Sequence, residues 1–280
     1  MTASHDTALV LGGGGLTGIA WETGLLLGLE RRGISLRSAE LIVGTSAGSA
    51  VAAQIAGPTP LEDLYDAQIE GRVQEIPGKL GLLSMLKLLL ALKGTANERA
   101  ALAKVGKHAL HAKTVAEPVR RAVIEQRLPV HDWPQTAMRI PAVNARTGEL
   151  VAFDAASGVD LVDAVAASCA VPMVWPSVTI GSQRYFDGGI RSTANVDLAA
   201  GYERIVVIAP TTASLRKGSG PSEQLAASAP TRSVIVAPDA PAKSAMGRNS
   251  LDPAARASAA RAGLAQAERV AEDVARAVGD

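Results

Sequence analysis

The pentapeptide GTSAG at residues 44–48 is the stretch of this sequence that most directly indicates chemistry. It fits the pattern G-x-S-x-G, in which a serine hydroxyl is lifted out of a tight turn between a strand and a helix. Only small neighbours avoid a clash in such a turn, and Gly44, Ala47 and Gly48 are small. An apolar stretch precedes the motif and a helix is expected after it. We therefore interpret Ser46 as a nucleophile rather than as part of a structural turn.

A serine hydroxyl is a weak nucleophile and needs a base within hydrogen-bond reach. In α/β-hydrolases that base is a histidine that follows both the serine and the acid in the chain. The sequence has four histidines, and none lies beyond residue 131: His5, His108, His111 and His131. A triad in that chain order is therefore excluded by counting.

A carboxylate remains as the candidate base, and Asp187 in the stretch YFDGG is the strongest one. An acid at the end of an apolar strand, followed by two glycines that expose it, is well placed to accept a serine proton. The glycines here are Gly188 and Gly189. Asp-Gly is also a common turn dipeptide, and the motif taken alone favours a turn. Both alternatives stay open at this point.

The stretch LGGGGLTG at residues 11–18 places four consecutive glycines after an apolar run and before an expected helix. Gly13 to Gly18 fits G-x-G-x-x-G, the dinucleotide-binding fingerprint. That function needs an acidic residue at the end of the second strand, to bind the ribose hydroxyl. Here the second strand ends in Gly44-Thr45-Ser46, without a carboxylate. The missing carboxylate argues against dinucleotide binding, and a phosphate-binding Walker loop is excluded, because no Gly-Lys-Ser/Thr follows.

The order of the strands and helices that must position these motifs predicts an α/β fold. We expect a three-layer α/β/α sandwich with a mostly parallel central sheet. Apolar runs predict strands at 8–11, 41–43, 137–145, 149–155, 177–180, 184–186, 204–210 and 233–238. Helical spacing predicts helices at about 18–32, 49–56, most of 59–127, 161–168 and from 253 onward. We expect one domain over 1–280, with the motif-bearing core at about 6–210. A mobile loop is expected at about 211–231, and a C-terminal strand and helix at 232–280.

The composition of the chain argues against nucleic acid as a partner. The 28 Lys and Arg nearly balance the 27 Asp and Glu, and aromatic residues make up 3% of the chain, so nucleic acid is not an expected partner. No group of residues has metal-ligand spacing, and no cofactor is expected. The N-terminal stretch lacks the pattern of a secretory signal, and no apolar run approaches the roughly 20 residues of a spanning helix. A cytoplasmic protein is therefore the expectation.

Taken together, and in their order and spacing along the chain, the three motifs resemble those of the patatin-like phospholipase family. The segment ASCAVPMVWPSVTIGSQRYFDGG at 167–189 resembles the family's approach to its catalytic acid, and the resemblance covers about 6–210. It implies that Ser46 is the nucleophile and Asp187 the base of a Ser-Asp dyad, which needs no downstream histidine. It further implies an oxyanion loop with Gly13, Gly14, Gly15 and Gly18, an elbow with Gly44 and Gly48, and acid-motif glycines Gly188 and Gly189.

The activity implied by the resemblance is hydrolysis of carboxylic esters of lipids, of the phospholipase A or lysophospholipase type. A general esterase or thioesterase acting on small acyl substrates is one alternative. A catalytically weak, lipid-binding regulatory protein is the other, and Thr17 is its only indication. The family often carries Arg or Lys at that position, where a cation would help to stabilise negative charge. Its absence argues against a strong preference for charged lipid.

The most apolar stretch of the chain is KLGLLSMLKLLLALK, from Lys79 to Lys93. It is too short to span a bilayer, and apolar residues occupy almost every direction around the expected helix. A helix of this kind is more often buried, which favours a core helix. The alternative is a peripheral membrane contact, in which the helix touches lipid and its lysines lie near phosphates.

Overall fold

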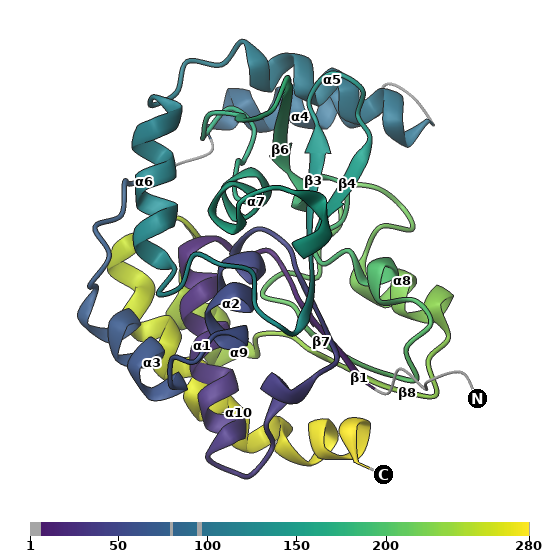
Figure 1. Cartoon of the computed structure of the whole chain (residues 1–280). Helices are drawn as coiled ribbons and strands as arrows, with labels where there is room; N and C mark the ends of the chain where they lie inside the picture. The colour runs from purple at the N-terminus through teal and green to yellow at the C-terminus, as the bar shows by residue number, and fades with distance from the viewer. Residues whose placement is uncertain (1–6, 79–80, 94–96, 280) are drawn as a thin grey trace.

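The computed structural model describes residues 7–78, 81–93 and 97–279. Its centre is an eight-stranded sheet in the order β5-β6-β3-β2-β1-β7-β8, in which β4 pairs with β3 (Figure 1). The strands are β1 (Thr7–Leu11), β2 (Leu41–Gly44), β3 (Ala137–Asn144), β4 (Leu150–Phe153), β5 (Val178–Ile180), β6 (Gln183–Asp187), β7 (Arg204–Ile208) and β8 (Arg232–Val236). The pairs β1-β2, β2-β3, β1-β7 and β7-β8 are parallel, whereas β3-β4, β3-β6 and β5-β6 are antiparallel. The sheet is therefore mostly parallel, as predicted.

Helices cover both faces of this sheet, which gives the expected three layers (Figure 1). They are α1 (Gly15–Glu30), α2 (Ala47–Ala56), α3 (Leu61–Glu70), α4 (Leu82–Lys93), α5 (Glu98–Leu110), α6 (Glu117–Arg127), α7 (Leu161–Ser168), α8 (Pro221–Ser228), α9 (Ala240–Met246) and α10 (Arg256–Val278). No helix in these described ranges is long and apolar enough to cross a membrane.

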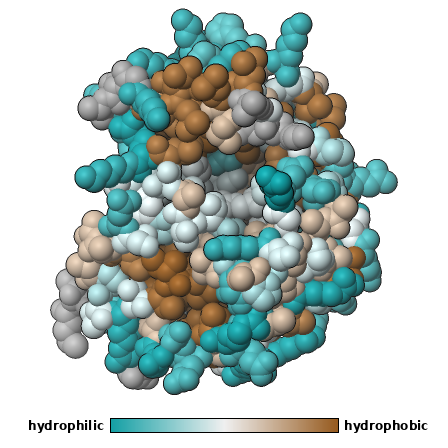
Figure 2. Space-filling model, turned by 180° about the vertical axis from the view of Figure 1, so that it is seen from behind, coloured by the Kyte–Doolittle hydropathy of each residue, from teal (hydrophilic) through white to brown (hydrophobic). Residues whose placement is uncertain are grey.

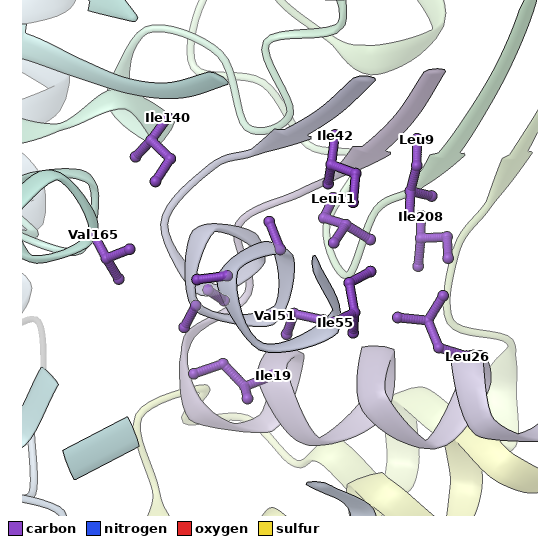
Figure 3. Close-up of a cluster of buried hydrophobic side chains, with 14 of the residues drawn as sticks. Leu9, Leu11, Ile19, Leu26, Ile42, Val51, Ile55, Ile140, Val165 and Ile208 are labelled. Atoms are coloured by element: carbon purple, nitrogen blue, oxygen red, sulfur yellow. The ribbon is translucent and has the colours of Figure 1, made fainter. Parts of the chain in front are cut away.

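Alternation along the central strands explains why both faces are covered. Leu9 and Leu11 of β1 belong to a core cluster that includes residues of α1, α2 and α10, while Ala8 and Val10 belong to another that includes Leu225 of α8. Successive side chains of a strand point to opposite faces, so an uninterrupted apolar strand needs an apolar layer on each side. Figure 3 shows the first cluster, in which α2 lies between the strands and α1.

Helix α1 begins at Gly15, three residues earlier than predicted, and nearly all of it is buried. Its close neighbour is α10, and the two helices lie so near each other that glycines are needed at their crossing. A Cβ on Gly24 of α1 would overlap the carbonyl of Ala260, and one on Gly263 of α10 would overlap the carbonyl of Trp21. The fixed α1–α10 pair holds the start of α1, and therefore the glycine loop, against the sheet.

Three parts of the chain differ from the sequence-based predictions. Helix α9 lies between the predicted C-terminal strand and helix, where no helix was predicted. Segment 211–231 contains α8, so the prediction of a mobile loop over about 211–231 is wrong at Pro221–Ser228. The expectation of a core helix at 82–93 is right for only one face of α4. Leu88, Ala91 and Leu92 are buried and pack against α5, whereas three other leucines of the helix are largely exposed: Leu83, Leu86 and Leu90. Lys79, at the start of the predicted stretch, lies outside the described residues.

Candidate active site

The glycine loop and the GTSAG turn are neighbours because they follow adjacent parallel strands. Leu11, the last residue of β1, is in register with Gly44, the last residue of β2. The carboxyl ends of parallel strands meet at one edge of a sheet, which is where sites form in such folds. Strand β6 runs antiparallel to β3, with Asp187 opposite Ala142, so its carboxyl end returns to the same place. Three distant sequence motifs thereby converge.

Ser46 occupies a sharp turn between β2 and α2. Its φ is 52° and its ψ is −117°, a left-handed conformation that costs a residue other than glycine on the order of 1–3 kcal/mol. The turn is closed by close backbone approaches. A Cβ on Gly44 would lie 2.6 Å from the carbonyl oxygen of Gly48, and one on Gly48 would overlap the carbonyl of Leu11. The strand, the turn and the helix therefore force the serine out of regular structure, as the motif predicts.

The hydroxyl of Ser46 meets the carboxylate of Asp187. Ser46 Oγ donates a hydrogen bond to Asp187 Oδ2 at 2.7 Å, and the amide of Gly189 donates to Asp187 Oδ1 at 2.7 Å. Ser46 is 9% exposed and Asp187 is 3% exposed. Burial raises the pKa of Asp187 to about 7, against the lowering effect of these two hydrogen bonds. Asp187 is thus a buried carboxyl group whose proton affinity suits proton exchange near neutral pH.

The predicted oxyanion-loop glycines do not all have free amide groups. The amide of Gly13 donates to the carbonyl of Thr193, and that of Gly18 donates to the carbonyl of Gly14 within the first turn of α1. The amides of Gly14, Gly15 and Ala47 donate no hydrogen bond to any residue in the described ranges. All three of these residues line the same cavity as Ser46. The donors available to a ligand therefore come from the start of α1 and the start of α2.

The cavity that contains Ser46 and Asp187 has a volume of about 370 Å³, within the usual range for small-molecule sites. Most of its lining is apolar and includes Leu16, Ile19, Leu88, Val171 and Trp175. In Figure 2, apolar side chains gather beside a central hollow, at the end of the molecule where Figure 1 places α4. A cavity of this character suits an acyl chain better than a polar metabolite.

Two polar residues that were not singled out from the sequence hold the turn and the acid in place. The side chain of Ser168, at the end of α7, accepts a hydrogen bond from the amide of Ser46 and donates one to the carbonyl of Pro141 in β3. Asn195 donates to Thr45 Oγ1 and to the carbonyl of Gly188, and so joins the turn to the acid motif. Both are fully buried. Ser168 does fall within the segment 167–189 quoted above, which was the only signal available.

The histidines take no part in this arrangement as far as the structure describes them. His108, His111 and His131 are exposed, and none of them lines the cavity. His5 lies outside the described residues. The carboxylate of Asp187 is therefore the titratable group in contact with the Ser46 hydroxyl.

The sequence model described as "Patatin-like phospholipase" matches residues 9–200, a range that includes the glycine loop, Ser46 and Asp187. The chain belongs to this family. At the level of the family, the protein is a lipid acyl hydrolase. No curated protein matches the chain by sequence.

Solved structures of similar fold include VipD and ExoU. VipD from Legionella pneumophila aligns with a TM-score of 0.51 and 14% identity, over 96% of this chain and 67% of that one. The type III effector ExoU aligns at 0.43 and 16%, over 99% and 54%. ExoU in complex with SpcU, from Pseudomonas aeruginosa, aligns at 0.40 and 16%, over 99% and 53%. The patatin-like chain thus spans about half the length of ExoU, and its similarity to VipD is one of fold.

Proposed function

We propose that this protein hydrolyses the carboxylic esters of lipids, as a phospholipase A or lysophospholipase, with Ser46 and Asp187 as a catalytic dyad. The observation that carries the proposal is the 2.7 Å hydrogen bond from Ser46 Oγ to Asp187 Oδ2 at the wall of a mostly apolar cavity. In the acylation step, Ser46 Oγ bonds to the acyl carbon while its proton passes to Asp187. The tetrahedral intermediate then collapses, and the leaving alcohol takes the proton from Asp187.

In the second step, Asp187 accepts a proton from water, and the resulting hydroxide attacks the acyl-serine ester. Collapse releases the fatty acid and returns the proton to Ser46 Oγ. Both tetrahedral intermediates carry a negative oxygen, which the amides of Gly14, Gly15 and Ala47 are available to bind. Fixed donors of this kind are commonly worth ~3–4 kcal/mol each in the transition state. The positive end of the α2 macrodipole lies at Ser46 as well and favours the same charge.

The test measures the release of fatty acid from two substrates, a lysophospholipid and a short-chain ester that has the same alcohol leaving group. The same two substrates are used for every variant. We expect turnover by the wild-type protein, with a higher kcat/KM on the long acyl chain. Ser46→Ala should abolish turnover of both substrates. A preference for the short ester would favour a general esterase, and the absence of turnover on both would favour a lipid-binding protein.

We further propose that α4 makes a peripheral contact with a lipid surface. Leu83, Leu86 and Leu90 are 67%, 51% and 63% exposed, on a helix that also carries exposed Lys87 and Lys93. The neighbouring Met85 and Leu88 line the cavity, so the same helix borders both the site and the exposed apolar surface. An apolar face flanked by lysines beside a lipid-binding cavity is the arrangement of an interfacial helix.

The two faces of α4 supply a matched test of this contact. Replacing exposed Leu86 and Leu90 by Ser should lower hydrolysis of phospholipid vesicles at least tenfold, with little change in Tm or in hydrolysis of a soluble ester. Leu88→Ser, at a buried position of the same helix, should lower Tm and both activities. Equal hydrolysis of vesicles by the double variant and the wild type would refute the contact.

A further inference from the structure

Arg120, on α6, is a buried cation whose hydrogen-bonding capacity is largely unused. It is 6% exposed, and its Nε and Nη1 atoms are buried without a hydrogen-bond acceptor among the described residues. Its strongest contact with an opposite charge is long, 3.9 Å from Nη1 to Glu75 Oε2. A buried charged donor without acceptors is costly, and such a group is retained only where something compensates for it.

Glu75 does not neutralise Arg120, because it already serves another arginine. Arg127 Nε and Nη2 contact the two oxygens of Glu75 at 2.7 and 2.6 Å, a bidentate ion pair. Two guanidinium groups and one carboxylate leave about one positive charge in this buried cluster. Burial, and then the charge of Arg127, lowers the pKa of Arg120 to about 10, so the guanidinium remains charged at neutral pH.

The excess positive charge lies in the lining of the cavity that contains the candidate active site. Arg120, Arg127 and Glu75 line the cavity that contains Ser46 and Asp187. The Trp175 ring, in the same lining, stacks on the Arg120 guanidinium with 3.9 Å from Cζ to the ring centroid. Stacking fixes the guanidinium plane and leaves its N–H groups to bind acceptors in that plane.

We propose that Arg120 is an anion-binding subsite that receives the phosphate of a lipid substrate whose ester lies at Ser46. The guanidinium matches the geometry of a phosphate, and a phosphate that displaces the atoms now covering Nε and Nη1 would supply the acceptors that they lack. Arg120 also borders a second hollow, but there the carboxylates of Glu117 and Asp163 balance Arg120 and Arg121, so that hollow carries no excess positive charge for an anion. This inference rests on the function proposed above, and it names the residue of this chain that would recognise the phosphate of the substrate.

The proposed subsite also bears on the absence of a basic residue at position 17, where the glycine loop has Thr17. That residue is fully buried and does not line the cavity, so the glycine loop supplies no cation to the substrate. Arg120 brings a cation to the same cavity from α6, a different part of the chain. The sequence-based argument against a preference for charged lipid therefore loses its basis.

The kinetic test compares a 1-acylglycerol 3-phosphate with the 1-monoacylglycerol of the same acyl chain. In Arg120→Met, the ratio of kcat/KM for the phosphate-bearing to the neutral substrate should fall at least tenfold, through KM, while Tm stays level or rises. Arg121→Met is the matched control, because Arg121 lies on the same helix outside this cavity and should keep the ratio. An unchanged ratio in Arg120→Met would overturn the proposal, whether both rates fall together or neither falls.

A binding test separates this proposal from the hydrolase proposal. Ser46→Ala should bind a non-hydrolysable 1-O-alkylglycerol 3-phosphate at least tenfold more tightly than the 1-O-alkylglycerol, and Ser46→Ala with Arg120→Met should lose that preference. Absence of turnover by the wild type with this preference intact would refute only the hydrolase proposal. Equal binding of the two ligands would refute the subsite, and so would tighter binding of inorganic phosphate alone than of the lipid phosphate.

Discussion

Replacing Asp187 by Asn should abolish activity and yet stabilise the protein at neutral and alkaline pH. The carboxylate is buried, and its pKa rises from the ordinary 3.8 to about 7. The folded protein therefore holds a proton on Asp187 at pH values where the unfolded chain has lost it. A group of this kind contributes stability below pH 3.8 that is lost as the pH rises through about 7. A shift of about three units corresponds to about 4 kcal/mol.

Asparagine preserves the geometry and removes this pH dependence. Its carbonyl can accept the hydrogen bond from the Gly189 amide, and its amide can donate to Ser46 Oγ. The free energy of unfolding of Asp187→Asn, relative to the wild type, should therefore increase by about 3 kcal/mol from pH 5 to pH 8. Urea denaturation of both proteins across that range measures the difference, in which the other titrating groups cancel.

Ser46→Ala provides the control for this experiment. It removes a hydrogen bond that lowers the pKa of Asp187, so the decline in its stability should continue to a higher pH than in the wild type. A difference between Asp187→Asn and the wild type that does not change with pH would refute the reasoning. It would mean that Asp187 ionises in the folded protein as readily as in the unfolded chain.

Three further predictions concern the rate and the supporting residues. Because Asp187 acts as a base only when ionised, kcat/KM should rise about tenfold per pH unit below about 7 and then level off; a profile that is flat from pH 5 to 8 would exclude it as the base. Gly14→Ala would press a Cβ against Pro210, so kcat should fall by about 10²–10³ with little change in KM. Gly13→Ala is the control, because a Cβ there has contacts of 3.4 Å or more, and it should lose less activity. Equal losses of kcat in the two variants would argue against the Gly14 amide as a donor. Ser168→Ala leaves the Ser46 amide without its acceptor and should cost about 1–3 kcal/mol in urea denaturation as well as lowering kcat; full stability would show that the Ser168 hydroxyl does not support the turn.

The fold could be predicted from the sequence where local patterns are strong. The apolar strands and the helix at 161–168 have patterns that fix their type, and the mostly parallel sheet follows from the strand and helix order. Helix α8 was missed because its Pro, Ser and Ala composition is also that of a loop, and α9 has only seven residues. The exposed face of α4 could not be predicted, because leucines on all sides give a helix no preferred face.

The candidate site could be predicted one residue at a time, but not as an arrangement. Ser46 and Asp187 each lie in a local motif, yet they are 141 positions apart, and their contact depends on the antiparallel return of β6 beside β3. The roles of Ser168 and Arg120 depend on tertiary neighbours alone. A buried serine in an apolar helix and an arginine among other helical arginines do not by their residue types indicate a site, although Ser168 lies within the segment 167–189 that resembles the family.

The central claim is that Ser46 is an activated nucleophile, and covalent labelling with a fluorophosphonate tests it most directly. Mass spectrometry of the labelled wild-type protein should locate a single adduct on the peptide that contains Ser46. Labelling should be absent in Ser46→Ala and slowed by several orders of magnitude in Asp187→Asn, since members of a catalytic unit fail together. Labelling of Ser46→Ala at the wild-type rate, or an adduct on a different residue, would contradict the account.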